Sequence, residues 1–296
     1  MSDKPVIGFI GLGLMGAAMV RRLQSLGYKI HTTANRNRAP IEAAVASGAT
    51  EHPNPAGVAA ESDILMLCVD TSDAVEKVML GDNGAMGALK AGAIVIDFGT
   101  SLPTSTRMLA DKAAERGAVF MDAPLGRTPV HAEDGKLNIM GAGPEETFGK
   151  VKPVLDDLGE NVFHVGPTGA GHELKLINNF YAQACAMGMA EAFVRADKAG
   201  IDRKTLYSVM SAGPLASGMM DFIRSYGIDG DPNSLKFSIV NARKDVGYFA
   251  QNADASGVGS DLAEGILKVL DGAIADGFGD RYLPEAVAWF EKRVGK

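Results

Sequence analysis

The chain has 296 residues, of which 46% are hydrophobic and 22% charged, and its formal net charge is -7. This composition is typical of a globular protein, and the length suffices for one large domain or two ordinary ones. No basic stripe is present, which argues against nucleic acid and against an anionic membrane surface as partners. A small anionic ligand is not excluded, because it needs only a local positive pocket.

The N-terminal segment is predicted to fold as strand, turn and helix. Lys4 is followed by VIGFIGLGLMGAAMV, which resembles a secretory signal but carries four glycines and ends in Arg21 and Arg22. It is also short for a bilayer span, so no membrane segment is expected. Cys68 and Cys185 lie in apolar runs and are interpreted as core residues, and the histidines show no metal-ligand spacing. We therefore expect no metal and a reducing, cytoplasmic setting.

The first part of the chain alternates short apolar strands with helical patterns. Apolar strands separated by helices indicate a parallel sheet covered on both faces. The prediction is a Rossmann-type α/β domain over residues 1–166. Strands are expected at 6–11, 29–34, 64–69, 93–99, 119–124, 137–143 and 161–166.

The second part, residues 167–296, is predicted to be an all-helical domain for substrate binding and oligomerisation. Asp202 and Ser260 are candidate N-caps. Few charges occur between 203 and 223, which favours a homo-oligomer, a dimer or tetramer. Helices are expected at 170–199, 203–212, 235–254, 260–276 and 284–294.

One lysine lies in the most apolar of these predicted helices. Lys175 is the only charged residue from Leu174 to Met189, in a stretch that otherwise predicts a buried helix. Burying an ammonium group is costly unless the charge is compensated. The pattern therefore indicates a functional role for Lys175.

A glycine-rich loop follows the first predicted strand and precedes a helix, as a dinucleotide site requires. The first glycine permits a tight turn, the second lets a pyrophosphate approach the backbone, and the third lets the helix pack on the strand. The helix N-terminus would offer amides to the phosphates. The predicted cofactor-binding residues of this loop are Gly11, Leu12, Gly13, Leu14, Met15 and Gly16.

The residues after the second predicted strand favour NADP(H), with NAD(H) as the alternative. An NAD-preferring site places an acidic residue about 20 positions beyond the glycines, but no Asp or Glu occurs between Asp3 and Glu42. Asn35, Arg36 and Arg38 occur there instead, and an arginine can bind a 2′-phosphate bidentately. Arg36 is the better candidate, and an exposed basic turn is the alternative interpretation.

Five motifs occur in an order that resembles the β-hydroxyacid dehydrogenase family: GFIGLGLMG, DFGTSLP, DAPLGRTPVHAEDGKL, GAGHELKLINN and ARKD. The resemblance covers nearly the whole chain. It implies an NAD(P)-dependent oxidoreductase that interconverts β-hydroxyacids and semialdehydes. It also implies that Lys175 is the catalytic acid/base. Asn179 follows four residues later and shares its helix face, so the amide can orient a substrate oxygen.

The resemblance assigns cofactor contacts and shows two departures. Thr100 is similar to the residue near the nicotinamide ribose, but Gly99 replaces the family's serine. Val69 and Asp70 stand where the family usually has Leu-Pro. The backbone at Val69 is still expected to line the cofactor.

The substrate loop departs most from the family pattern. Gly126, Arg127 and Thr128 resemble the corresponding residues of sulfolactaldehyde reductases, where the arginine helps to bind a sulfonate. The alternative is that Arg127 pairs with Asp134 or Glu133 in its own loop.

Three further positions in these motifs have open or structural interpretations. Lys244 is predicted to contact substrate or cofactor, with an ordinary surface pair with Asp245 as the alternative. Asp122 and His172 are interpreted as structural.

The sequence thus predicts an NADP-preferring reductase or dehydrogenase of a short anionic substrate. Reduction of 3-sulfolactaldehyde is the leading prediction, and 3-hydroxyisobutyrate, tartronate semialdehyde and succinate semialdehyde are the alternatives. A non-catalytic NADPH sensor is the alternative from another class. The intact pair of Lys175 and Asn179 argues against a sensor.

Overall fold

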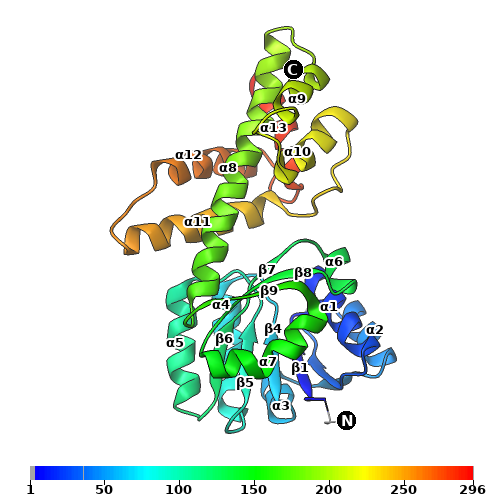
Figure 1. Ribbon diagram of the computed structural model, residues 1–296, viewed down its shortest axis with the longest axis vertical. Coiled ribbons are helices and arrows are strands. Elements are labelled where there is room, and N and C mark those ends of the chain that lie inside the picture. Colours follow the sequence, from blue (N-terminus) through cyan, green and yellow to red (C-terminus); the bar gives the residue numbers. More distant parts are fainter. Residues whose placement is uncertain (1–3, 36, 296) are drawn as a thin grey trace. The chain divides into compact units, whose positions relative to one another are not determined.

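The structure is a computed structural model that describes residues 4–35 and 37–295. It divides into two compact units, Met1–Lys175 and Leu176–Lys296 (Figure 1). The first unit is built on a sheet and the second is helical, which is the predicted fold class. The domain boundary at residue 166 stays a prediction.

The sheet of the first unit has the strand order β3-β2-β1-β4-β5-β6-β8-β7, with β9 pairing with β8. Every pairing from β3 to β6 is parallel. The strands are β1 (Ile7–Ile10), β2 (Ile30–Thr33), β3 (Thr50–His52), β4 (Ile64–Leu67), β5 (Ile94–Asp97), β6 (Val119–Asp122), β7 (Leu125–Gly126), β8 (Leu137–Ala142) and β9 (Gly159–Gly166).

The sheet departs from the predicted parallel arrangement at β8, which runs antiparallel to β6 and β7. Parallel neighbours need a crossover that spans the sheet, usually a helix, whereas antiparallel neighbours need only a short connection. The segment between β6 and β8 holds only β7 and the five-residue helix α6 (Pro129–Glu133), so the chain turns back. The strands β3 and β7 were not predicted, because three and two residues carry no periodicity.

Both faces of the central strands are buried, as the continuous apolar runs predict. Neighbouring residues on a strand point to opposite faces. Thus Met66 belongs to the apolar cluster that includes Met19, while Leu65 and Leu67 belong to the one that includes Leu109. Helices cover these faces: α1 (Leu14–Ser25), α2 (Ala39–Ala46), α3 (Pro55–Ala60), α4 (Ser72–Leu80), α5 (Pro103–Ala114) and α7 (Glu145–Leu158), with the 3₁₀ turn η1 (Ala85–Ala88).

The second unit packs helices around a core that includes Phe193, Ile223 and Trp289. Asp202 and Ser260 cap their helices as predicted, accepting hydrogen bonds from backbone amides three residues on. The helix α10 was not predicted, because Gly218 and further glycines interrupt the helical pattern. The first turns of α8 (Ala170–Lys198) belong to the first unit and the rest of that helix to the second. The other helices are α9 (Arg203–Ser211), α10 (Gly218–Asp229), α11 (Ile239–Ala255), α12 (Asp261–Ala275) and α13 (Ala286–Arg293), with η2 (Leu283–Glu285).

Helix α8 differs from the expectation of an all-round buried helix. Leu174, Ile177 and Tyr181 are 40%, 49% and 70% exposed. These positions recur three and four residues apart, so they form one stripe along the helix. Within residues 4–35 and 37–295, no helix is both long and apolar enough to cross a membrane.

Candidate active site

The glycine loop after β1 has the geometry that a pyrophosphate site needs. Gly11 has φ of 100°, and a Cβ there would lie 2.3 Å from the Cys68 carbonyl oxygen. A Cβ on Gly16 would lie 2.0 Å from the Gly11 carbonyl oxygen, so only glycine allows α1 to pack this closely. At Gly13, by contrast, no atom lies within 4 Å of the Cβ position. This open position at the start of α1, where backbone amides lack helical partners, fits a dinucleotide phosphate.

The region predicted to bind the 2′-phosphate is described only in part. Asn35 is exposed, and Arg36 lies outside the described residues. The Arg38 guanidinium forms a bidentate pair with Glu51, at 3.1 and 3.0 Å. Arg38 is therefore already engaged, which leaves Asn35 and Arg36 as the residues to test.

The loop after β5 is shaped by a buried carboxylate. Asp97, 1% exposed, accepts hydrogen bonds from the Gly99 amide and the Ser101 hydroxyl, each at 2.8 Å. Thr100 lies half-buried between them. A Cβ on Gly99 would lie 2.9 Å from the Val69 carbonyl oxygen, so the serine of the family pattern would require this loop to shift. The glycine at position 99, where the family has serine, therefore allows the loop after β4 to lie this close.

Lys175 reaches the substrate loop. Its Nζ donates a hydrogen bond of 2.6 Å to the carbonyl oxygen of Leu125, and the side chain is half-buried. Gly171, one turn earlier on α8, packs so closely that a Cβ would lie 2.4 Å from the Met140 carbonyl oxygen. This close packing brings the first turns of α8 against the segment that contains Leu125.

Asn179 contacts Asp245, a residue that the sequence analysis associated only with Lys244. Its Nδ2 donates a 2.6 Å hydrogen bond to Asp245 Oδ2, and both residues are buried. Lys244 Nζ lies 3.0 Å from the other oxygen of Asp245. An amide nitrogen carries two N–H groups, so one remains for another acceptor. The ARKD motif was the only sequence signal for Asp245, and it did not identify Asn179 as a partner.

Arg127 pairs with a residue that the sequence did not suggest. Its Nη1 donates a 2.7 Å hydrogen bond to the Lys136 carbonyl oxygen and forms an ion pair with Glu160 of β9. The expected alternatives are wrong, because Glu133 pairs with Arg21 and Asp134 with Lys136. Among the hydrogen bonds of the described residues, Arg127 donates only through Nη1. The N–H groups of Nε and Nη2 can therefore donate to another acceptor.

Gly126 and Thr128, the neighbours of the exposed Arg127, are partly buried. Gly126 ends β7, and the Thr128 hydroxyl lies 2.8 Å from His131 Nδ1. Thr128 therefore shares its hydroxyl with a neighbouring imidazole that can accept or donate a proton.

The Cys68 thiol lies beside Asp97 and is buried. Burial, and to a lesser extent the Asp97 carboxylate, raises the pKa of the Cys68 thiol to about 12. The thiol therefore stays protonated at neutral pH, and a thiol in this state is a poor nucleophile. In the parts of the chain that the structure covers, no group of three or more His, Cys, Asp or Glu side chains could hold a metal ion.

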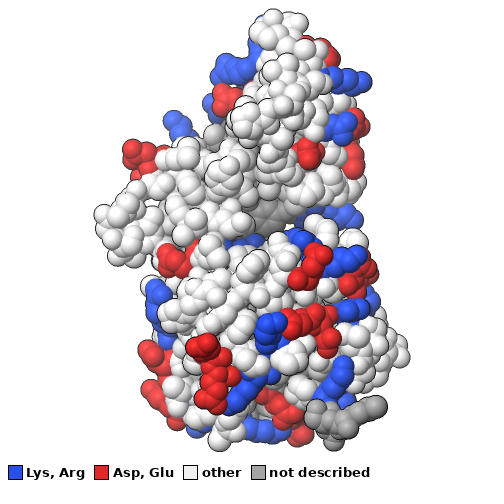
Figure 2. All heavy atoms as spheres, in the orientation of Figure 1, with Lys and Arg blue, Asp and Glu red and all other residues white. Residues whose placement is uncertain are grey.

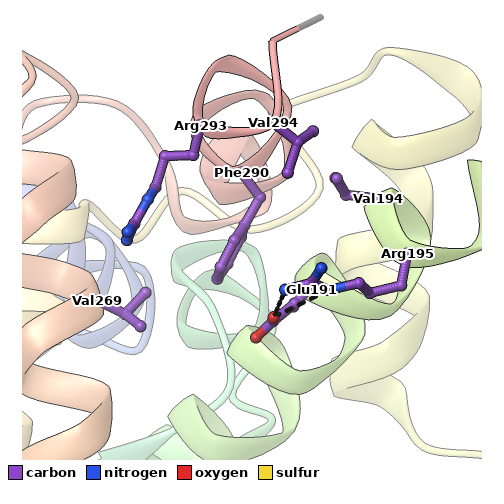
Figure 3. Close-up of a pocket in the computed structure, with 7 residues that line it drawn as sticks. All are labelled: Glu191, Val194, Arg195, Val269, Phe290, Arg293 and Val294. Carbon is purple, nitrogen blue, oxygen red and sulfur yellow. Dashed lines mark hydrogen bonds and ion pairs between the residues drawn. The ribbon is translucent and has the colours of Figure 1, made fainter. Parts of the chain in front are cut away.

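A pocket of about 290 Å³ lies within the second unit (Figure 3). Phe290 projects into it, and Arg195 is tied to Glu191 by a hydrogen bond of 3.0 Å. None of the predicted site residues lines this pocket.

On the surface of the first unit, Figure 2 shows acidic and basic side chains intermingled over the visible face.

Two family models together cover most of the chain. The model described as the NAD binding domain of 6-phosphogluconate dehydrogenase matches residues 6–166. The model described as the NAD-binding domain of NADP-dependent 3-hydroxyisobutyrate dehydrogenase matches residues 169–289.

Known proteins with similar sequences and structures agree with these matches. The chain is 32% identical to 2-(hydroxymethyl)glutarate dehydrogenase of Eubacterium barkeri, over 98% of this chain and 96% of that protein. It is also 32% identical to 3-sulfolactaldehyde reductase of Escherichia coli strain K12, over 92% and 91%. The structure of 3-hydroxyisobutyrate dehydrogenase of Mycobacterium tuberculosis with L-serine has a TM-score of 0.87 at 23% identity, over 97% and 99%, which shows a shared fold. The glycine loop, the motif order and these matches lead to one conclusion: the chain belongs to the β-hydroxyacid dehydrogenase family of NAD(P)-dependent oxidoreductases.

Proposed function

We propose that the protein is an NADP(H)-preferring reductase of short anionic semialdehydes that also oxidises the corresponding β-hydroxyacids, with Lys175 as the acid/base. The contact between Lys175 Nζ and the Leu125 carbonyl oxygen, at 2.6 Å, carries this proposal. It holds a half-buried ammonium group at the segment that leads into Gly126, Arg127 and Thr128. An acid placed beside the substrate loop is what carbonyl reduction needs.

The chain's own groups supply the proton chemistry. The bound nicotinamide supplies the hydride for reduction and accepts it in the reverse direction. As negative charge develops on the carbonyl oxygen, the Lys175 ammonium donates a proton to it, and in oxidation the neutral amine accepts the hydroxyl proton. Asn179 lies one turn further along α8, on the same helix face. We assign its second amide N–H to the substrate oxygen, with Asp245 holding the first.

We assign the far anion of the substrate to Arg127, Thr128 and the Gly126 amide. A guanidinium presents several donors in a plane, which suits a sulfonate or a carboxylate. The similarity to 3-sulfolactaldehyde reductase supports a sulfonate, so 3-sulfolactaldehyde is the first substrate to test.

The similarity to 2-(hydroxymethyl)glutarate dehydrogenase, whose named substrate carries a distal carboxylate, supports carboxylated semialdehydes as the second candidates. These include the succinate and tartronate semialdehydes and the aldehyde derived from 3-hydroxyisobutyrate.

The cofactor preference rests on Asn35 and Arg36 and on the lack of any Asp or Glu between Asp3 and Glu42 in the sequence. One or two charge-assisted hydrogen bonds to a 2′-phosphate, at about 1.5–3 kcal/mol each, would favour NADP(H) over NAD(H) by 10-fold or more. Lys244, which contacts Asp245, is assigned to substrate or cofactor. Thr100 and the Val69 backbone are assigned to the nicotinamide side.

Steady-state kinetics on 3-sulfolactaldehyde and the three carboxylated aldehydes, each with NADPH and NADH, tests this proposal. Lys175→Ala should lower kcat by about 10²-fold or more, since it removes the general acid, and should leave NADPH affinity unchanged. Lys150→Ala, which removes an exposed lysine of α7, is the matched control. Near-normal turnover in Lys175→Ala would refute the assignment. NADPH binding without consumption across all four aldehydes would instead indicate a sensor.

A further inference from the structure

Two buried carboxylates and one buried imidazole form a cluster in the first unit that the reaction scheme above does not use. Asp97 ends β5, Asp122 ends β6, and His172 lies in the first turn of α8. The three side chains are at most 1% exposed. His172 Nε2 lies 3.7 Å from Asp97 Oδ2, and His172 Nδ1 lies 3.8 Å from Asp122 Oδ2.

A threonine determines the role of one imidazole nitrogen. The Thr106 hydroxyl donates to the Leu102 carbonyl oxygen at 3.1 Å and lies 2.7 Å from His172 Nδ1. A hydroxyl has one hydrogen, so Thr106 accepts from Nδ1 when that hydrogen goes to Leu102. The Asp122 carboxylate, 3.8 Å from Nδ1, favours this arrangement, because it attracts an N–H at that nitrogen.

The second nitrogen faces a carboxylate. Nε2 is oriented toward Asp97, so a lone pair on this nitrogen would face a negative charge in a buried site, whereas an N–H is attracted to it. Both oxygens of Asp122 accept hydrogen bonds from backbone amides, one from Gly169 at 2.6 Å and one from His172 at 2.7 Å. A carboxylate that accepts on both oxygens has little room for its own proton.

We propose that His172 is a positioning residue, held as an imidazolium, that neutralises Asp97 and Asp122 and thereby fixes the two loops and the helix start around Lys175. Asp97 shapes the loop that carries Thr100, through Gly99 and Ser101. Asp122 binds the first amides of α8, and Lys175 follows one turn later. With His172 charged, the cluster carries one net negative charge instead of two.

Two further ionisable groups of the described residues lie near the cluster. The Cys68 thiol interacts with Asp97 and is protonated. Arg107 of α5 lies beside Gly169, close to the α8 start, and is exposed. Burial raises the pKa of Asp122, and the facing imidazole and the two amides oppose that shift. The imidazole is thus the buried cation placed between the two carboxylates.

The part of this inference that concerns catalysis rests on the proposed function, so its first test does not use activity. In protein labelled with ¹⁵N-histidine, both ring nitrogens of His172 should give the protonated signature throughout about pH 5 to 8, where free imidazole titrates. His172→Gln assigns the signal. If that variant does not fold, substitution of His31, His52, His131 and His164 assigns it by elimination. A neutral tautomer at pH 8, or titration near the ordinary value, would overturn the proposal.

The second test uses charge rescue. His172→Gln removes the imidazole that faces both carboxylates, and misplacement of reacting groups should lower kcat by about 10-fold to 10²-fold. In His172→Gln/Asp97→Asn the net charge of the cluster is restored, because asparagine is neutral. Its amide can still accept from the Gly99 amide and donate to Ser101 Oγ. Turnover should recover to within a few-fold of the wild type. A double variant as slow as the single one, or slower, would show that His172 acts by shape alone and would sink the proposal.

These tests separate the two proposals. Normal turnover in Lys175→Ala would refute the proposed function and leave the protonation of His172 intact. A neutral His172 would refute the cluster proposal without affecting the role of Lys175.

Discussion

At the scale of single residues, Arg127 is the position with the clearest conflict between local preference and proposed role. Its φ of 76° lies in the left-handed region, which favours glycine. A non-glycine residue there costs about 1–2 kcal/mol. A side chain retained at this cost indicates a use for its charge, and Glu160 competes for that charge.

Arg127→Ala should raise the KM for an anionic aldehyde far more than the KM for its uncharged analogue, because only the former loses a charged contact. Measurement of KM and kcat for both substrates checks this. Equal effects on the two substrates would show that Arg127 is structural.

Glu160→Gln should act in the opposite direction. Removal of the competing carboxylate leaves the guanidinium for the substrate, so the KM for the anionic aldehyde should fall several-fold. Glu133→Gln removes the carboxylate that pairs with Arg21 instead, and is the control. An unchanged KM in Glu160→Gln would mean that Glu160 does not compete with the substrate.

At the scale of elements, a tyrosine before β2 connects the sheet to helix α7. The Tyr28 hydroxyl donates a 2.7 Å hydrogen bond to Asp157 Oδ2. Burial first, and then the contact with Asp157, raises the pKa of Tyr28 above its usual range. The folded state therefore holds this proton more tightly than the unfolded chain, so stability is fully present below about pH 10 and is lost as the pH rises toward the raised pKa.

Tyr28→Phe should consequently lower the free energy of unfolding by about 1 kcal/mol at neutral pH. Above about pH 10 the variant should lose less further stability than the wild type. Denaturant unfolding at a series of pH values measures both effects. Parallel pH profiles for the two proteins would contradict the assignment.

At the scale of the whole molecule, cofactor binding should stabilise the fold unequally for the two nicotinamide cofactors. A ligand at about 100 times its Kd adds about 2.7 kcal/mol of stability. NADPH should therefore raise Tm by several degrees, and NADH at the same concentration by less. In Arg36→Ala the two shifts should become equal. Equal shifts in the wild type would show that the chain does not prefer NADP(H).

The sequence predicted the parts of the fold that depend on periodicity. Long apolar runs such as ILMLCV predicted central strands, and Asp202 and Ser260 predicted helix starts, because side-chain spacing and capping are local properties. The short strand β7 and the antiparallel β8 were missed, because a two-residue strand has no period and strand direction depends on how the chain turns back. Helix α10 was missed because its glycines weaken the local pattern.

For the candidate site, the sequence by itself determined the chemical types: a glycine loop for phosphates, a lysine in an apolar helix, and an arginine in the substrate loop. Each depends on residue identity and short spacing. Tertiary structure alone decided which groups meet. The contacts at the site join residues that lie far apart in the chain: Leu125 with Lys175, Glu160 with Arg127, Asp245 with Asn179, and His172 with Asp97 and Asp122. Such contacts leave no local pattern, because only the packing of strands and helices brings those side chains within hydrogen-bonding distance.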